Sequence, residues 1–185
     1  MIEQIMSDYA KSNDSFCAIA LRYFNPIGAH PSGTIGESPN DIPNNLMPYI
    51  MRVANGHLPF LGVFGSDYNT VDGTGVRDYI HVTDLAKGHT AALKKHEEGN
   101  FDGYHVFNLG TGNGTSVLQL VAAFEKASGV KVEVQMQPRR EGDAEQCLAI
   151  PNKANEDLKW KTELNIEDMC RDTWKWAKQN PNGYE

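Results

Sequence analysis

Glycine-rich and arginine-bearing turns are the parts of this 185-residue sequence whose residue types can bind phosphate. The first is Leu109-Gly-Thr-Gly-Asn-Gly-Thr-Ser116, which lies between an expected strand and an expected helix, the position of a dinucleotide-binding fingerprint. The third glycine of that fingerprint falls at Thr115, and Glu133, at the spacing of a ribose-binding acid, lies inside an alternating strand. The segment is therefore interpreted as a tight turn in which Thr115 or Ser116 caps the next helix.

Arginines in two other glycine-containing turns offer a second phosphate-binding chemistry. Arg77 follows the loop that ends at Gly75, and Pro138-Arg-Arg-Glu-Gly-Asp143 places two guanidiniums and two carboxylates in one turn. Because arginine presents a planar fork of donors to phosphate oxygens, separated arginines of this kind suit a local diphosphate site. Spacing alone leaves open whether the arginines converge, and a charged run is also the usual composition of a solvated loop.

Histidine and cysteine patterns give little support to other site chemistries. The six histidines form no HExxH or HxH motif and none pairs with a cysteine, so no metal site is expected. The three cysteines, Cys17, Cys147 and Cys170, are widely spaced and form no CxxC motif. This spacing excludes a disulfide scaffold and a zinc ribbon, and it is typical of a protein of the reducing cytoplasm.

The charge balance excludes two classes of partner. Acidic residues outnumber basic ones by 24 to 17, which gives a formal net charge of −7. Such a chain has no global attraction for a nucleic-acid backbone or an anionic lipid surface, so neither is expected as a partner. No apolar run approaches the roughly 18 residues of a membrane span, and residues 1–10 lack the basic and apolar regions of a signal peptide.

Strands and helices alternate in the predicted pattern, which indicates an α/β fold. Helices are expected over residues 1–11, 44–56, 84–98, 116–128, 153–159 and 166–179, and strands over 16–24, 60–64, 78–82, 104–109 and 130–136. An asparagine is expected to cap the second helix, and Thr83 or Asp84 the third. The segment 16–24 is almost unbroken apolar, as in a strand buried on both faces, yet few similar strands are available to cover it. The segment 25–43, rich in proline and glycine, is expected to form a long loop.

Four segments give the chain a close resemblance to a known family. They are Arg22-Tyr-Phe-Asn-Pro-Ile-Gly-Ala-His-Pro-Ser-Gly33, Ile42-Pro-Asn-Asn-Leu-Met-Pro-Tyr49, Asp72-Gly-Thr-Gly-Val-Arg-Asp-Tyr-Ile-His-Val82 and Pro138-Arg-Arg-Glu-Gly-Asp143. In order and spacing they resemble the UDP-glucose 4-epimerases of the extended short-chain dehydrogenase/reductase family. The resemblance implies the last part of a doubly wound, parallel Rossmann domain in residues 1–24. Residues 25–185 would form mainly the smaller α/β domain that binds the UDP-sugar. Within these residues the chain would also return to the Rossmann domain.

The resemblance also implies an activity and its cofactor. Members of the family interconvert UDP-glucose and UDP-galactose by inverting C4 through a 4-keto intermediate, with tightly bound NAD, as cytosolic homodimers. Their reaction needs a glycine-rich NAD loop and a Tyr-x-x-x-Lys pair. The resemblance places both ahead of Met1, so no catalytic residue is expected in this chain.

Thirteen residues carry the implied NAD and UDP-sugar contacts: Tyr23, Phe24, Asn25, Asn44, Asn45, Leu46, Gly62, Val63, Phe64, Arg77, Arg140, Asp143 and Cys147. By the resemblance, Tyr23 lies beside the nicotinamide, and Phe24 and Asn25 line the sugar and diphosphate. Residues 44–46 start a helix and turn side-chain and backbone donors to the diphosphate. Residues 62–64 offer backbone hydrogen bonds and an aromatic face to uracil.

The charged members of the set and its cysteine have separate implied roles. Arg77 and Arg140 clamp the diphosphate, and Asp143 accepts hydrogen bonds from the ribose hydroxyls. Cys147 forms a wall of the sugar pocket near C2. Because its thiol is small, the pocket is expected to admit a 2-acetamido group, and with it UDP-N-acetylglucosamine and UDP-N-acetylgalactosamine.

Two alternative hypotheses stay open from the sequence alone. The first is a non-catalytic module that binds UDP-sugars, which the missing Tyr-x-x-x-Lys pair favours. The second is another nucleotide-sugar enzyme of the extended family, such as a dehydratase or a decarboxylase. The Asn44-Asn-Leu-Met47 run counts against the second hypothesis.

We predict that the 185-residue chain by itself does not interconvert UDP-glucose and UDP-galactose. Loss of a general base alone costs roughly 10²–10⁴-fold in rate, and without the hydride carrier the reaction has no path. The check is a product assay of the purified chain with added NAD and either substrate. Turnover above the level of a protein-free blank would contradict the prediction.

Overall fold

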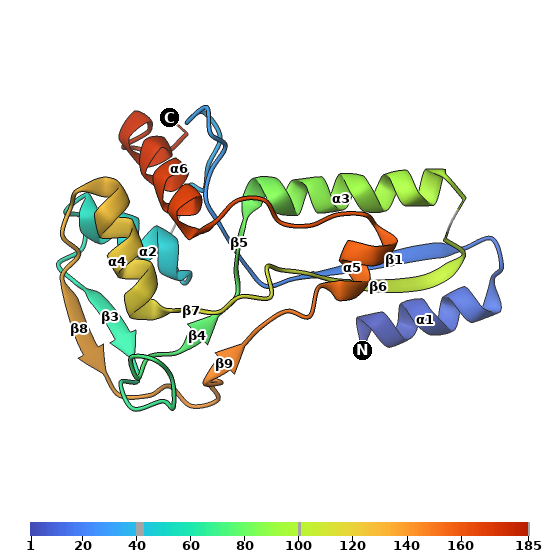
Figure 1. The fold of residues 1–185 in the computed structure, drawn as a ribbon, viewed down its shortest axis with the longest axis horizontal. Helices are drawn as coiled ribbons and strands as arrows, with labels where there is room; N and C mark the ends of the chain where they lie inside the picture. The colour runs from blue at the N-terminus through green and yellow to red at the C-terminus, as the bar shows by residue number, and fades with distance from the viewer. Residues whose placement is uncertain (40–42, 100, 185) are drawn as a thin grey trace.

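Parallel pairing between strands that lie far apart in the sequence organises the fold (Figure 1). The computed structural model describes residues 1–39, 43–99 and 101–184, so Ile42, the first residue of one motif above, lies outside the description. The parallel pairs join β1 (Cys17–Tyr23) to β6 (Gly103–Leu109), β2 (Asn25–Ile27) to β5 (Tyr79–His81), and β3 (Leu61–Phe64) to β8 (Val134–Gln137). Parallel strands need long crossovers, and here helices lie between the partners, which gives the predicted α/β fold.

The β1–β6 pair is the centre of the first of two lobes. Figure 1 shows α1 (Ile2–Ser12) along one face of the pair and α3 (Val82–Glu97) along the other. The short helix α5 (Asn152–Asp157) packs beside β6. Buried apolar side chains of this lobe form one cluster, which includes Ile80, Leu85, Phe107, Leu109, Leu158 and Trp160.

Strand β1 is less buried than the sequence predicts. The expectation of burial on both faces is wrong, because its first five residues are half-buried and Arg22 and Tyr23 are exposed. Among the described strands β1 pairs with β6 alone. A strand with one neighbour leaves part of its faces and its second edge uncovered, which explains the difference from a central parallel strand.

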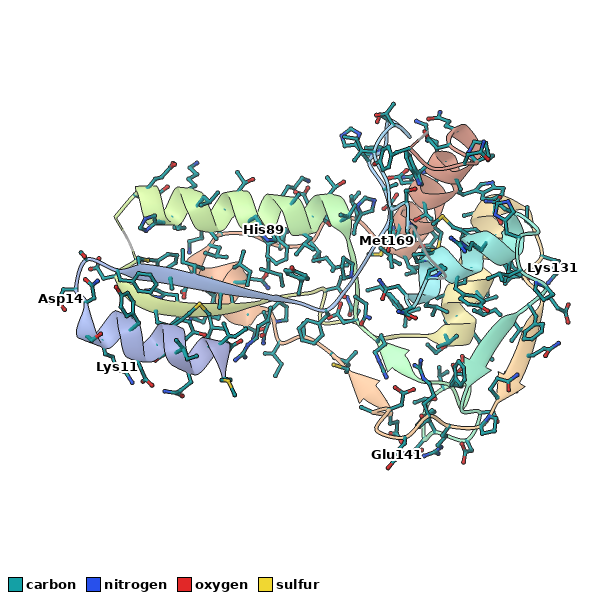
Figure 2. The ribbon with its side chains drawn as sticks, turned by 180° about the vertical axis from the view of Figure 1, so that it is seen from behind. Lys11, Asp14, His89, Lys131, Glu141 and Met169 are labelled. Carbon is teal, nitrogen blue, oxygen red and sulfur yellow. The ribbon has the colours of Figure 1, made fainter. Side chains whose placement is uncertain are left out.

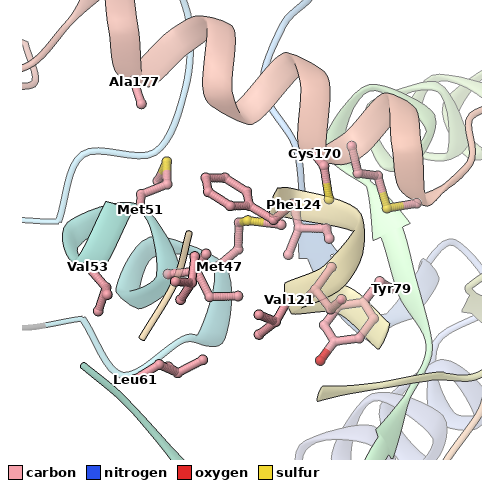
Figure 3. Packing of buried hydrophobic residues seen from close by; sticks show 14 of the residues in the cluster. Met47, Met51, Val53, Leu61, Tyr79, Val121, Phe124, Cys170 and Ala177 are labelled. Atoms are coloured by element: carbon pink, nitrogen blue, oxygen red, sulfur yellow. The ribbon is translucent and has the colours of Figure 1, made fainter. Parts of the chain in front are cut away.

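The second lobe contains the β3–β8 pair and three helices, α2 (Leu46–Ala54), α4 (Val117–Ser128) and α6 (Ile166–Gln179). Of these helices, α2 contacts β3 and α6 packs against α4. Figure 3 shows Met47 and Met51 of α2, Phe124 of α4 and Cys170 of α6 pointing toward one another. Phe124 is fully buried, and its ring meets that of Trp174 edge to face, with centroids 5.8 Å apart. This second cluster is the larger of the two cores.

A small three-stranded sheet lies between the lobes. Strand β4 (Val76–Arg77) is central, with β7 (Thr115–Ser116) antiparallel on one side and β9 (Gln146–Cys147) parallel on the other. None of these two-residue strands was predicted, because two residues are too few to show an alternating pattern. They bring segments from three separate parts of the chain together.

The predicted cap of α4 is confirmed. The Ser116 Oγ accepts a hydrogen bond from the Gln119 backbone N at 3.1 Å, and the Gln119 Oε1 accepts one from the Ser116 backbone N at 2.9 Å. This reciprocal pair is a capping box. At α2 the N-cap residue is Asn45, an asparagine as predicted. Its side chain, however, makes no capping hydrogen bond. The chain leaves α2 through Gly56, which has a φ of 73°.

The predicted cap of α3 is wrong. The helix begins at Val82, and the N-cap is His81, whose Nδ1 accepts a hydrogen bond from the Thr83 backbone N at 3.0 Å. Asp84 lies inside the first turn, where its carboxylate accepts from the backbone N of Leu164 at 2.9 Å. A histidine gives no strong sequence signal as a cap, so the rule that favours serine, threonine and aspartate selected the wrong residue.

Two predicted boundaries also differ from the structure. The strand expected over residues 130–136 begins only at Val134, because the backbone N of Val132 donates to the Glu125 side chain at 2.9 Å instead of to another strand. The expected loop over 25–43 opens with the short strand β2, which pairs with β5. A side-chain contact decided the first boundary and long-range strand pairing the second, and an alternating pattern encodes neither.

The capping histidine is also the centre of a buried polar group. His81 is fully buried, and its Nε2 lies 3.3 Å from the Asp172 Oδ2. Since Nδ1 accepts from the Thr83 N, Nε2 carries the proton and donates to Asp172. Asp172 also accepts a hydrogen bond from the Arg171 Nε at 2.9 Å. Burial lowers the pKa of His81 and outweighs the opposing effect of the Asp172 carboxylate.

We expect stability to fall as the pH drops below about 6.5, the ordinary pKa of histidine. Because the folded-state pKa of His81 is lowered, the unfolded chain binds this proton more tightly, so the contribution is complete above pH 6.5 and lost below it. His81→Asn keeps a capping acceptor and removes the titration, so urea unfolding should lose part of its pH dependence between about pH 5 and 6.5.

The matched control is His57→Asn, at an exposed histidine, which should keep the pH dependence of the parent chain. A pH dependence that is the same in His81→Asn and in the parent would rule out this role of His81.

Candidate functional site

A cavity of about 470 Å³ lies beside the small sheet that joins the lobes. Its volume is within the range of small-molecule sites, which is roughly 300–1,000 Å³. Eleven of the thirteen residues singled out in the sequence line it: Phe24, Asn25, Asn44, Asn45, Leu46, Gly62, Val63, Phe64, Arg77, Arg140 and Asp143. The tertiary fold therefore brings together residues from five separate stretches of the chain.

The cavity opens beyond the carboxyl ends of parallel strands. Phe24 and Asn25 follow directly after β1, while Phe64 and Gln137 are the last residues of the paired strands β3 and β8. In open α/β sheets this edge is where ligands bind, because the loops that follow the strands converge there. The backbone N of Asn25 donates to the Asp78 backbone O at 3.0 Å, which fixes the position of this asparagine.

Two arginines from separate segments line the same cavity. Arg77 extends from β4, and its Nη1 donates to the Val76 backbone O at 2.9 Å. The Arg140 guanidinium lies 4.7 Å from the centre of the Phe64 ring, and its Nε donates to the Asp143 Oδ2 at 2.9 Å. Stacking and ion pairing restrict the Arg140 side chain before any ligand binds. Two positive charges therefore face one cavity, the arrangement that spacing alone left open.

The start of α2 forms another wall. Asn44, Asn45 and Leu46 line the cavity, and the first backbone N–H groups of a helix have no partner within the helix. The Asn45 side chain bonds to the Glu37 carboxyl, whose pKa is raised because desolvation outweighs the effect of this hydrogen bond. This wall presents neutral donors, and together with the arginines it suits an anionic ligand.

The structure adds three tyrosines that sequence reasoning missed, Tyr49, Tyr68 and Tyr79, all of which line the cavity. The phenol of Tyr79 lines the cavity, and burial raises its pKa to about 12, so the hydroxyl stays protonated and able to donate. Tyr68 also lines the cavity, with the Arg139 guanidinium 4.1 Å from its ring centre. The Tyr68 hydroxyl is buried without a hydrogen-bond partner among the described residues. Tyr79 stands inside one of the sequence motifs, whereas nothing in the local pattern marks Tyr68.

Two predicted residues lie outside the cavity lining. Tyr23 is 53% exposed at the end of β1, and its ring centroid is 6.0 Å from that of His89, which Figure 2 labels on α3. Cys147 is exposed in β9, directly opposite Arg77 of β4. Partners in parallel register point to the same face of a sheet, so Cys147 stands on the face from which Arg77 reaches the cavity.

The glycine-rich turn after β6 does not form a dinucleotide site. The backbone N of Thr111 donates to the Asp78 Oδ1 at 2.9 Å, and the backbone N of Gly112 donates to the Asp78 Oδ2 at 2.8 Å. An internal carboxylate therefore occupies the donors that a pyrophosphate would need. Tyr23 is exposed at the carboxyl end of β1, the edge of a parallel sheet at which such cofactors bind. The described residues thus do not fit a complete dinucleotide site.

No three histidine, cysteine or acidic side chains in the described part of the chain lie together as metal ligands would. No described helix is long and apolar enough to cross a membrane.

The fold defines an α/β protein of the extended short-chain dehydrogenase/reductase class. Residues 1–173 match the family model described as GDP-mannose 4,6 dehydratase. The chain belongs to this family, and the similar proteins within it are UDP-glucose 4-epimerases.

Curated relatives extend over about twice the length of this chain. UDP-glucose 4-epimerase 2 of Arabidopsis thaliana is 59% identical over 183 residues, which are 99% of this chain and 52% of the relative. The UDP-glucose 4-epimerase of Haemophilus influenzae is 56% identical over 184 residues, 100% of this chain and 54% of the relative. The chain therefore spans about half of the proteins it resembles.

A solved structure confirms the predicted fold class. UDP-glucose 4-epimerase from Bifidobacterium longum, in complex with NAD+ and UDP, superposes with a TM-score of 0.93 at 49% identity. The alignment covers 98% of this chain and 53% of that structure. The lobes and the small sheet between them therefore follow the arrangement of part of that enzyme.

Proposed function

We propose that this chain forms the UDP-sugar-binding part of a UDP-glucose 4-epimerase. The observation that carries the proposal is the convergence of Arg77 and Arg140 on one cavity that also has a helix start and an exposed aromatic ring. A UDP-sugar combines a diphosphate, a flat base and a polyhydroxyl sugar, and the cavity offers a partner of matching chemistry for each. The similarity to UDP-glucose 4-epimerases supports the same assignment.

The diphosphate is assigned to the two guanidiniums and to the start of α2. Arg140 is held over Phe64 at 4.7 Å, so its charge is positioned in advance and less conformational entropy is lost when an anion binds. Residues 62–64 are assigned to uracil, with backbone groups of β3 and the ring of Phe64 as contacts. Asp143, ion-paired to Arg140 at 2.9 Å, is assigned to the ribose hydroxyls. Phe24 and Asn25 line the sugar and the diphosphate.

NAD is the cofactor that the proposal requires. When bound, it would accept the C4 hydride of the sugar and return it. In this chain Tyr23 is assigned to its nicotinamide end, since the glycine-rich turn already binds Asp78. The other contacts to NAD, and the general base, would come from residues outside these 185.

A homodimer in the cytosol is part of the same proposal. The helix α1 exposes Ile2, Ile5 and Tyr9 at 74%, 61% and 52%. Apolar side chains on one helix, left in water, are typical of a surface that another chain covers. We assign this surface to the subunit contact of the complete protein.

We expect the chain to bind UDP and to lose affinity in Arg77→Ala and Arg140→Ala. Each variant removes a charge-assisted hydrogen bond to phosphate, which is worth roughly 1.5–3 kcal/mol and weakens binding roughly 10- to 100-fold. Isothermal titration of the purified chain with UDP measures the change.

Arg22→Ala is the matched control, since Arg22 pairs with Glu3 in the first lobe, outside the cavity lining. Its UDP affinity should equal that of the parent chain. If neither cavity arginine affected binding, the segment 138–143 would be a solvated loop and the proposal would fail.

Substrate breadth is assigned to Cys147. The small thiol stands opposite Arg77 in the β4–β9 pair, at the edge of the face that the sugar would approach. We propose that this position leaves room for a 2-acetamido group at C2, so that UDP-N-acetylglucosamine and UDP-N-acetylgalactosamine are bound as well as the unmodified sugars.

Cys147→Tyr should weaken UDP-N-acetylgalactosamine binding by at least about tenfold and largely spare UDP-galactose, because a phenol ring would overlap the acetamido group. Competition titrations against UDP measure both affinities. Cys147→Ser, which keeps the side chain small, should leave both unchanged. An equal effect of Cys147→Tyr on the two sugars would remove the basis for this assignment.

A further inference from the structure

Asp78 is a fully buried carboxylate next to the cavity and not among its lining residues. Its Oδ1 accepts hydrogen bonds from the Thr111 backbone N at 2.9 Å and the Thr111 Oγ1 at 2.7 Å. Its Oδ2 accepts from the backbone N of Gly112 at 2.8 Å and of Ala149 at 3.1 Å. Four donors from two distant segments thus satisfy one buried charge, which would otherwise be costly to bury.

The glycine-rich turn is shaped for this carboxylate. A Cβ on Gly110 would lie 2.8 Å from the Asp78 Oδ2 and 2.4 Å from the Ala149 Cβ, so only glycine fits there. Gly112 has a φ of 75°, in the region that glycine adopts most readily. Successive backbone N–H groups turned inward in this way form an anion-binding nest. Its anion is a side chain of the same protein.

The main chain of Asp78 ties further site segments together. Its backbone O accepts from the Asn25 N at 3.0 Å, and its backbone N donates to the Cys147 O at 3.1 Å. Its neighbours in sequence, Arg77 and Tyr79, both line the cavity. Asp78 is therefore the point where the end of β1, the β4–β5 segment, β9 and the glycine-rich turn are joined.

We propose that Asp78 is a positioning residue for the diphosphate-binding face, and that its negative charge, held by the glycine-rich turn, sets the position of Arg77 and of β9. Without the charge the turn has no anion, and the contacts to Thr111, Gly112 and Ala149 are lost together. Arg77 and the segment that carries Arg140 and Cys147 would then no longer be held at the cavity. This inference rests on the proposed function for its ligand.

The test is chemical rescue of Asp78→Ala in the 185-residue chain. The variant leaves a space the size of a carboxylate, lined by the same four donors. We expect UDP affinity, measured by isothermal titration in sodium chloride, to fall about 10- to 100-fold. Sodium formate at the same ionic strength should restore most of the affinity, because formate supplies the missing carboxylate. Formamide, which has the same shape without the charge, should not.

A second readout does not depend on UDP. Hydrogen exchange of residues 144–149 and of Thr111 and Gly112 should speed up in Asp78→Ala and slow again with formate. If the parent chain failed to bind UDP, the proposed function would fall while this exchange result still tested the anchoring role. Protection unchanged in Asp78→Ala, or restored equally by formate and formamide, would overturn the role of the charge.

Thr111→Val covers the case in which Asp78→Ala does not fold. It removes one of the four donors and keeps the side-chain volume, so a smaller loss of UDP affinity and of exchange protection is expected. The matched control is Thr90→Val on α3, whose hydroxyl donates to the Ala86 backbone O of the same helix at 3.3 Å. Equal affinity and protection in Thr111→Val and the control would contradict the proposal.

Discussion

The buried carboxylate of Asp78 is the interaction on which the centre of this structure depends. A charge removed from water must be matched by donors, and here they come from the glycine-rich turn and from Ala149, 33 to 71 residues away in sequence. Their folding is therefore coupled to that of the β4–β5 segment. The two-residue strands of the small sheet are too short to be stable alone, and this network keeps them in place.

The cavity beside that network is organised by contacts that exist without a ligand. Arg140 stacks on Phe64 and pairs with Asp143, while Arg77 extends from a strand whose neighbours are both hydrogen-bonded to it. Side chains held in this way lose less freedom on binding than side chains in an open loop. The cavity and its arginines are therefore already formed in a chain that spans about half the length of its relatives.

The two lobes differ in how completely their strands and helices are buried. The lobe around Phe124 has helices packed on its strand pair and the larger buried core. The lobe around β1 has a strand with one partner and a helix α1 that exposes apolar side chains. Most of the residues that line the cavity lie on the lobe around Phe124 and near the small sheet. The position of the residues that line the cavity therefore depends mainly on the lobe around Phe124 and less on the lobe around β1.

The local sequence pattern determined a good part of the secondary structure of this protein. The bounds of α6 agree with the helix predicted over 166–179, and Ser116 caps α4, because periodicity and capping act between residues a few positions apart. Side-chain chemistry alone also marked the arginine-bearing turns as candidates for a diphosphate site, and the resemblance selected Arg77 and Arg140. The resemblance supplied the residues around them, and the fold places nine of those residues at the same cavity as Arg77 and Arg140.

Only the tertiary structure decided which segments that are distant in the sequence come into contact. It showed that Arg77 and Arg140 face the same space, that His81 caps α3, and that the glycine-rich turn holds Asp78. Each of these contacts joins groups whose pairing no short window of sequence contains, or replaces a usual residue type with an unusual one. A turn that binds an anion looks the same in sequence whether the anion is a ligand or an aspartate of the same chain, because the backbone N–H groups that bind it are common to all residues except proline.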